Sequence, residues 1–191
     1  MNWIKRFYEE RFNQMLQKGK VLVLHGSRQV GKTSLVNRMI KDQPKVFKGD
    51  GNDLTVNELL SSQKLSLLLN AFHGYDMIFI DEAHKINNIG QTLKLLVDHE
   101  PDMTIIASGS SAFDLSNKLG EPLTGRQNVY ILYPISILEL IENTGRMEVI
   151  QQLENILIFG CYPEVITSKN NDQRIQYLIN LRNAFLLKDI L

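Results

Sequence analysis

Apolar residues occur along the chain in two patterns: short continuous runs, and longer stretches in which they recur every three or four positions. The runs are rich in β-branched residues, which is typical of strands buried on both faces of a sheet. Predicted strands lie at residues 20–24, 45–48, 76–81, 103–108 and 126–134. Predicted helices lie at residues 3–16, 32–41, 54–72 and 86–97. Strands that alternate with helices predict an α/β fold with a five-stranded, mainly parallel sheet between helices.

Only helical periodicity appears after residue 135. Further helices are predicted around residues 149–157 and 172–191, after a first one that begins near residue 136. We therefore expect a core domain over residues 1–135, which includes the N-terminal helix, and a helical domain over residues 136–191. The last stretch, FLLKDIL, is strongly apolar and has no glycine stop, so we expect it to pack on a segment that follows in a longer chain.

Two predicted helix starts carry a capping-box pattern, in which a Ser or Thr is followed three residues later by Glu. Thr55 and Glu58 predict the start of the helix over residues 54–72, and Ser136 and Glu139 predict the start of the helical domain. At such a start, the hydroxyl and the carboxylate satisfy backbone N–H groups that have no partner within the helix.

Composition favours a globular protein of the cytoplasm. The chain has 191 residues, of which 43% are hydrophobic, enough to form a packed core. A membrane-spanning helix needs about 20 consecutive apolar residues, and the sequence contains no such run. The single cysteine, Cys161, cannot form an intramolecular disulfide, which fits a reducing compartment. We expect a cytoplasmic location and no membrane association.

The net charge of zero hides a gradient along the chain. Residues 1–50 carry 11 Lys and Arg against 4 Asp and Glu, whereas residues 51–191 carry 10 against 17. Charge alone leaves two interpretations open. Either an anionic ligand binds near the N-terminal part, or the basic side chains only solvate the first helices.

The stretch GSRQVGKT follows the first predicted strand and precedes a predicted helix. It matches G-x-x-x-x-G-K-[ST], the P-loop, in which backbone N–H groups and a helix N-terminus bind phosphate. Lys32 is expected to contact the β- and γ-phosphates of ATP, and Thr33 to bind Mg²⁺. The predicted nucleotide-binding residues are Gly26, Ser27, Arg28, Gln29, Val30, Gly31, Lys32, Thr33 and Ser34. A glycine-rich structural turn would explain neither the lysine nor the threonine, so we predict that the chain binds ATP and ADP.

The letters DEAH stand at the carboxyl end of a predicted buried strand, where ligands of open α/β sheets gather. Asp81 is predicted as a further Mg²⁺ ligand, and Glu82 as the catalytic carboxylate that polarises the attacking water. Ser108 ends the next predicted strand and is expected to sense the γ-phosphate. Ser110 and Ser111 are alternatives that would instead cap a helix.

The sequence disfavours three other classes of enzyme. A helicase with a DEAH motif needs a second motor domain and a basic track for nucleic acid, and this chain has neither the length nor the charge. His84 is expected to hydrogen-bond near the γ-phosphate or to begin a helix. The sequence lacks a G-x-S-x-G motif and zinc-ligand spacing among its four histidines, so a serine hydrolase and a zinc enzyme are not favoured.

A series of motifs extends over nearly the whole chain: LHGSRQVGKTSL, IDEAHKI, SGSSAFDL, LTGR, YPIS, GCYPEVI and LLKDI. In this order they resemble the prokaryotic ATPases of the AAA_14 type, AAA+ relatives close to the STAND signalling ATPases. The resemblance implies an AAA+-like P-loop NTPase core followed by the start of a helical lid. It also implies a winged-helix-like portion and a DUF4143-type domain beyond Leu191, through which the protein would act on a protein partner.

The resemblance implies further site residues. Arg126 in LTGR is expected to act in catalysis by contacting the γ-phosphate, from its own chain or a neighbour, with a surface or salt-bridging arginine as the alternative. Gly160 and Pro163 resemble the Gly-x-Pro turn that positions adenine in STAND relatives, although two residues intervene here; a helix-terminating turn is the alternative. Arg6 and Tyr8 are candidate neighbours of the base or phosphates, with core packing as the alternative.

Together these features predict a Mg²⁺-dependent ATPase that hydrolyses ATP to ADP and phosphate as a conformational switch. Two alternatives remain. One is a nucleotide-gated binding module with little turnover, and the other is a nucleic-acid-processing motor, which the neutral total charge disfavours. The sequence leaves open the oligomeric state and the identity of the protein partner.

Overall fold

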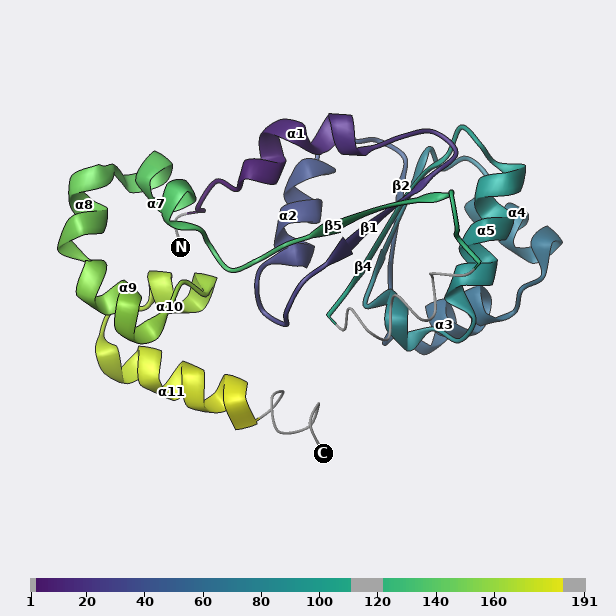
Figure 1. Cartoon of the computed structure of the whole chain (residues 1–191). Helices are drawn as coiled ribbons and strands as arrows, with labels where there is room; N and C mark the ends of the chain where they lie inside the picture. The colour runs from purple at the N-terminus through teal and green to yellow at the C-terminus, as the bar shows by residue number, and fades with distance from the viewer. Residues whose placement is uncertain (1–2, 111–121, 184–191) are drawn as a thin grey trace. The chain divides into compact units, whose positions relative to one another are not determined.

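The computed structural model describes residues 3–110 and 122–183 (Figure 1). Contacts divide the chain into two compact units. The sheet unit comprises residues 10–27 and 32–132; the helical unit comprises the first nine residues, residues 28–31 and the residues from 133 on. Ser111 and the FLLKDIL stretch lie outside the described residues, and so do the predictions made for them.

The sheet unit contains five parallel strands, which confirms the predicted α/β class. They are β1 (Val21–His25), β2 (Val46–Asp50), β3 (Met77–Asp81), β4 (Thr104–Gly109) and β5 (Gln127–Ile131). Their order across the sheet is β2-β3-β4-β1-β5, and every neighbouring pair is parallel. The carboxyl ends of all five strands therefore meet at one edge of the sheet, which we call the carboxyl edge.

Helices cover both faces of this sheet. They are α2 (Lys32–Met39), α3 (Leu54–Ser61), α4 (Leu65–Phe72), the short 3₁₀ helix η1 (Ala83–Lys85), α5 (Ile89–His99) and the C-terminal part of α1 (Phe7–Met15). Figure 1 shows α3, α4 and α5 on one face and α2 on the other. Side chains alternate along a strand, so Val21 and Val23 join the core with α3–α5, and Leu22 and Leu24 face the opposite side.

The helix predicted over residues 54–72 is two helices, α3 and α4. The chain breaks between them at Gln63, whose φ of 54° lies in the left-handed region. The predicted capping box of Thr55 and Glu58 is wrong: Asp53 is the N-cap, and its carboxylate accepts hydrogen bonds from the amides of Thr55 and Val56. An N-cap residue has an extended backbone and stands just before the first helical residue. Asp53 occupies that position, whereas Thr55 already lies within the helix.

The helical unit contains five helices among its described residues: α7 (Ile137–Thr144), α8 (Arg146–Gln151), α9 (Leu153–Phe159), α10 (Pro163–Thr167) and α11 (Asn171–Leu181). The predicted capping box of Ser136 and Glu139 is confirmed at the start of α7. The predicted helix over residues 149–157 is instead divided at Gln152 between α8 and α9.

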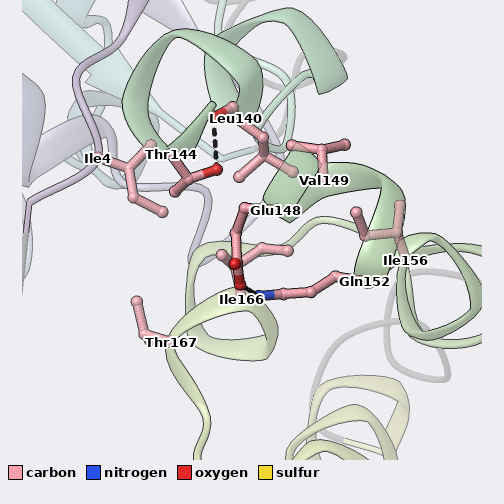
Figure 2. A pocket seen from close by; sticks show the side chains of 9 residues that line it. All are labelled: Ile4, Leu140, Thr144, Glu148, Val149, Gln152, Ile156, Ile166 and Thr167. Atoms are coloured by element: carbon pink, nitrogen blue, oxygen red, sulfur yellow. Dashed lines mark hydrogen bonds between the residues drawn. The ribbon is translucent and has the colours of Figure 1, made fainter. Parts of the chain in front are cut away.

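A small apolar core holds the helical unit together. Its buried members are Ile135, Leu140, Val149 and Ile156. Beside them lies a cavity of about 310 Å³, lined by Ile4, by side chains of α7–α10 and by the Thr144 hydroxyl, which donates to the Leu140 carbonyl (Figure 2). Within residues 3–110 and 122–183, no helix has the length and apolar character needed to cross a membrane.

Candidate nucleotide site

The loop between β1 and α2 begins at the carboxyl edge of the sheet. Its backbone takes left-handed angles at Gln29 (φ 63°) and at Gly31 (φ 96°). A Cβ atom at Gly31 would meet no atom within 4 Å, so the backbone angle rather than space requires glycine there. The loop then passes directly into α2 at Lys32, which brings a helix N-terminus and its free N–H groups to this edge.

Lys32 folds back across the loop. Its ammonium donates hydrogen bonds to the carbonyl oxygens of Gly26 at 2.9 Å and Ser27 at 3.0 Å, and the residue is only 5% exposed. A buried positive charge therefore lies within the curve of the loop, where it can attract a negatively charged phosphate group. The loop belongs to both units: residues 28–31 make their contacts in the helical unit, and its remaining residues in the sheet unit.

Asp81 is the centre of a three-residue hydrogen-bond cluster at the carboxyl edge. The Thr33 hydroxyl, in the first turn of α2, donates to Asp81 Oδ2 at 2.5 Å. The hydroxyl of buried Ser108, near the end of β4, donates to Asp81 Oδ1. Strands β3 and β4 are adjacent, so the residues that end them meet. Three residues predicted separately from three segments are thus brought together.

Glu82 follows Asp81 in a left-handed backbone conformation, with φ of 47°. This conformation is uncommon for a residue other than glycine and is a form of backbone strain that clusters at functional sites. The Glu82 carboxylate lies 3.5 Å from Nε2 of buried His84, and its side chain is 25% exposed. His84 lies in η1 rather than at the start of a longer helix. The carboxylate thus has a local partner and also reaches the surface.

Gly51 and Asn57 support the turn at Glu82, and the sequence reasoning missed both. The Gly51 amide donates to the Asp81 carbonyl at 2.8 Å, and a Cβ at Gly51 would lie 2.4 Å from the Glu82 carbonyl oxygen. The Asn57 amide donates to the carbonyls of Gly51 and Lys85. A signal was available, because Gly51 follows the strand β2 directly at the carboxyl edge.

His25, the last residue of β1, was also missed as part of the site. Burial, followed by the nearby charge of Lys32, holds the pKa of His25 below its usual value. The imidazole is therefore neutral at pH 7. A neutral ring here adds no second positive charge beside the Lys32 ammonium.

Arg126 does not lie beside the P-loop of its own chain. Its carbonyl accepts the Val21 amide at the start of β1, whereas the loop follows the end of β1. Four residue steps of parallel strand separate these ends by about 13 Å. The Arg126 guanidinium instead pairs with Asp98 of α5 at 2.6 Å. The expected contact with the γ-phosphate within one chain is therefore wrong, because Arg126 lies at the opposite edge of the sheet.

The other residues expected from the family resemblance lie in the helical unit. Gly160 ends α9 with φ of 76°, and Pro163 is in the first turn of α10 after its N-cap Tyr162. A glycine after one helix and a proline at the start of the next are ordinary helix-end chemistry. Their role beside adenine stays a prediction. Arg6 is buried and donates to three acceptors.

The donor set at Asp81 fits Mg²⁺. This ion takes oxygen ligands and is usually held by one or two protein groups together with waters and substrate phosphates. The Thr33 hydroxyl and the Asp81 carboxylate supply two such oxygens, which are hydrogen-bonded to each other. Among the described residues, no three His, Cys, Asp or Glu side chains gather into a larger metal cluster. These residues therefore suit a Mg²⁺ site whose remaining ligands are phosphate oxygens and waters.

Comparison with known proteins agrees with this arrangement. The model of an AAA domain family, AAA_14, matches residues 18–141. Two uncharacterized proteins, Mb2031c of Mycobacterium bovis and Rv2008c of Mycobacterium tuberculosis, are each 27% identical over 182 residues. The match covers 94% of this chain but 38% of each relative, so the chain spans well under half of their length.

Two solved structures have a similar fold. The Walker-type ATPase PABY2304 of Pyrococcus abyssi aligns with a TM-score of 0.65 at 15% identity, over 98% of this chain and 75% of that one. The STAND protein PH0952 of Pyrococcus horikoshii, which carries a tetratricopeptide repeat sensor, aligns with a TM-score of 0.56 at 14% identity, over 94% and 32%. With its match to most of the P-loop core, the chain belongs to the AAA_14 family of AAA-type P-loop ATPases.

Proposed function

We propose that this chain binds Mg²⁺ and ATP at the loop over residues 26–33 and hydrolyses ATP to ADP and phosphate. The observation that carries the proposal is the convergence on Asp81, which accepts hydrogen bonds from both Thr33 and Ser108. These side chains come from three segments of the sheet unit, and each was predicted from sequence for phosphate or metal chemistry. Family membership supports the same chemistry.

Each residue at the site has a role that follows from its chemistry. Lys32 brings positive charge to the β- and γ-phosphates, and the N–H groups of the loop bind phosphate oxygens. The Ser108 hydroxyl, which donates to Asp81 in this structure, would turn to donate to the γ-phosphate. Mg²⁺, with Thr33 and Asp81 as its protein ligands, neutralises charge on the phosphate oxygens when it is bound.

Glu82 is the proposed catalytic carboxylate. It accepts a hydrogen bond from a water molecule and orients that water in line with the bond between the γ-phosphorus and its bridging oxygen. A new bond forms from the water oxygen to phosphorus while the bridging bond breaks and its electron pair leaves on ADP. The displaced water proton is passed on to phosphate or solvent.

Hydrolysis is proposed to work as a switch that changes the conformation of the helical unit and, through it, the binding of a protein partner. The difference between the two states is the set of contacts made by the γ-phosphate, Ser108 among them. A protein is proposed rather than a nucleic acid because a chain of net charge zero offers no general electrostatic attraction to phosphates of a nucleic-acid backbone. Arg126 is proposed as a catalytic residue only for a neighbouring chain.

A second candidate function is a nucleotide-gated binding module with little turnover. One observation favours it: the Glu82 carboxylate lies 3.5 Å from Nε2 of His84, and this partner competes with a water molecule for the carboxylate. In that case the nucleotide would change the conformation by binding alone.

Measurement of ATP binding and phosphate release tests both candidates. We compare the wild-type chain with Lys32→Ala, Glu82→Gln and Lys41→Ala, the last being a control because Lys41 is exposed and forms an ion pair with its neighbour Asp42. A hydrolytic switch requires that Lys32→Ala loses binding and that Glu82→Gln keeps binding but loses turnover. Binding without turnover in the wild-type chain supports the binding module. Absence of binding in the wild-type chain contradicts both.

A further inference from the structure

Arg6 is a buried arginine that joins three distant segments of the helical unit. Its Nη1 donates to the Val30 carbonyl at 3.1 Å, its Nη2 to the Tyr133 carbonyl at 2.6 Å, and its Nε to Glu139 Oε1 at 3.0 Å. The residue is 5% exposed. A buried guanidinium is tolerated only when it is paired and hydrogen-bonded, and here each of its three nitrogens has an acceptor.

Glu139 holds this arginine in place. Its Oε1 also accepts the Phe7 amide at 2.9 Å, and its Oε2 accepts the Ser136 amide at 2.9 Å. Burial acts to raise the pKa of Glu139, but hydrogen bonds from the Ser136 and Phe7 amides and the hydrogen bond and charge of Arg6 outweigh it, so the pKa lies below its usual value. The carboxylate is ionised at neutral pH, and the pair is a charged one.

The contact between Arg6 and Val30 fixes the orientation of one peptide group in the P-loop. In a planar trans peptide the carbonyl and the following N–H point in opposite directions. The Val30 carbonyl points at the guanidinium, so the Gly31 N–H points away from it. Gln29 and Gly31 on either side have left-handed angles, 63° and 96°, which shows how specific the backbone path is. That peptide cannot rotate without breaking the hydrogen bond to Arg6.

We propose that Arg6 is a positioning residue for the P-loop, fixed in turn by Glu139, and that nucleotide binding and the Arg6–Glu139 pair are energetically coupled. The proposal rests on the proposed nucleotide binding at the loop. Arg6 orients the loop from the side opposite its Gly31 N–H and does not itself touch phosphate. Glu139 lies in the first turn of α7, so the same pair connects the loop backbone to the first helix of the helical unit.

Coupling has two consequences that can be measured. Loosening the pair should weaken nucleotide binding, and nucleotide binding should tighten the pair, because coupling between two sites is reciprocal. Arg6→Lys keeps the charge but replaces three fixed donors with a single mobile ammonium, which cannot hold three acceptors in the same directions. Glu139→Gln does not touch the Arg6–Val30 contact itself; it removes the charge that pairs with Arg6, and its NH2 group replaces one of the two oxygens that accept from Arg6 and Phe7 or from Ser136.

The first test measures the dissociation constant of a fluorescent ADP analogue for the wild-type chain, Arg6→Lys, Glu139→Gln and the control Arg11→Lys. Arg11 is an exposed arginine of helix α1, which begins one residue after Arg6. All are measured below the unfolding temperature of the least stable variant. We expect Arg6→Lys and Glu139→Gln to weaken binding by about tenfold, a typical coupling, and Arg11→Lys to leave it unchanged. Folded variants that bind like the wild type would overturn the proposal while leaving the proposed function intact.

The second test uses the unaltered protein and so does not depend on the folding of a variant. Hydrogen exchange at the Phe7 amide, which donates to Glu139, is followed with and without ADP. Coupling requires slower exchange at Phe7 when ADP is bound; an unchanged rate contradicts it. If the wild-type chain binds no nucleotide in the first test, the proposed function fails, and this proposal fails with it.

Discussion

At the scale of single residues, the backbone of Glu82 depends on a glycine that directly follows the strand β2. Gly51 leaves room for the Glu82 carbonyl, since a Cβ there would lie 2.4 Å from that oxygen. The turn that directs the Glu82 side chain therefore requires a residue without a side chain at position 51.

Gly51→Ala is predicted to lower turnover while nucleotide binding is kept. The added methyl must displace the Glu82 backbone, and misplacement of a catalytic group by about 1 Å can reduce a rate by about 10²-fold. Steady-state phosphate release gives kcat and KM, and a fall in kcat with little change in KM is expected. Asn52→Ala, at the next and exposed position, is the control. A folded Gly51→Ala variant with normal kcat would show that the position of Glu82 does not limit the reaction.

His25 gives the stability of the protein a pH dependence of known sign. Burial and then the Lys32 charge lower the pKa of folded His25 below the value of 6.5 expected when unfolded. Above pH 6.5 the ring is neutral in both states. As the pH falls below 6.5 the unfolded chain takes up a proton that the folded protein resists, so the free energy of unfolding falls by up to about 1.4 kcal/mol per pH unit.

Urea unfolding at pH 7.5 and pH 5.5 checks the His25 prediction. His25→Gln cannot titrate, so the difference in unfolding free energy between the two pH values should shrink relative to the wild-type chain. His73→Gln changes an exposed histidine and serves as the control. Equal differences in wild-type and His25→Gln proteins would show that His25 does not carry the dependence.

Local motifs predicted that the P-loop residues and Asp81 lie at the carboxyl edge, because a P-loop lies between a strand and a helix and an acidic residue at a strand end reaches that edge. Arg6 was assigned only by resemblance, and its three acceptors could not be foreseen. Its partner Glu139 lies 133 residues away. Such a pairing depends on tertiary contacts. Sequence motifs relate residues only a few positions apart, so they could not predict it.

At the scale of helices and strands, the hydrophobic pattern predicted which segments exist better than where they end. All five strands were placed: β1, β3 and β4 are continuous apolar runs buried within the sheet, whereas β2 and β5 are edge strands with partly exposed side chains. The break between α3 and α4 was missed, since apolar periodicity continues across it and one left-handed residue, Gln63, interrupts the helix. The N-cap was placed wrongly for a similar reason: Asp53 offers a stronger acceptor than the Thr55 hydroxyl, and spacing alone does not rank them.

The capping box of α7 makes a prediction about stability. Ser136 Oγ accepts the Glu139 amide at 3.2 Å, and Ser136→Ala leaves that amide without its partner. Loss of a Ser N-cap destabilises a protein by about 0.5–2 kcal/mol, and the higher end is expected because Glu139 also holds Arg6. Urea unfolding measures the change. Ser168→Ala at the end of α10 should have a smaller effect, and equal effects would contradict a special role for the box.

The position of Arg126, one residue before β5, makes a prediction about catalysis. Arg126→Ala should leave nucleotide affinity unchanged, because the residue lies about 13 Å along the sheet from the P-loop end of β1. Its exposed pair with Asp98 should contribute at most about 1 kcal/mol to stability. Phosphate release is measured at low and high protein concentration. A loss of turnover confined to high concentration indicates an arginine supplied by a neighbour, and a loss of affinity at low concentration contradicts the placement.

At the scale of the whole molecule, the order of the strands accounts for the site. β1 and β3 flank β4, so the P-loop after β1, Ser108 in β4 and Asp81 at the end of β3 lie side by side at one edge. Alternation of strands and helices predicted a parallel sheet, but the strand order was not encoded in any local pattern. The sequence pattern alone therefore does not predict that Thr33, Asp81 and Ser108 form one cluster. That prediction also needs the strand order typical of P-loop proteins.

Nucleotide binding should stabilise the helical unit as well as the sheet unit. A ligand that binds only the folded state raises the free energy of unfolding by about 2.7 kcal/mol at 100 times its dissociation constant. The single tryptophan, Trp3, is in the helical unit, where its indole donates to Glu9 at 2.6 Å. Trp3 fluorescence therefore follows the helical unit during urea unfolding, while circular dichroism follows the whole chain.

Both signals should shift to higher urea when Mg²⁺ and ADP are present, because Arg6 ties the loop backbone at Val30 to the helical unit. Lys32→Ala should show no shift in either signal, since it removes the charge that binds phosphate. Glu139→Gln should keep a shift in circular dichroism but lose most of the shift in Trp3 fluorescence. If wild-type Trp3 fluorescence does not respond to ADP while circular dichroism does, the two units respond to nucleotide independently, and the switch must act by another route than Arg6.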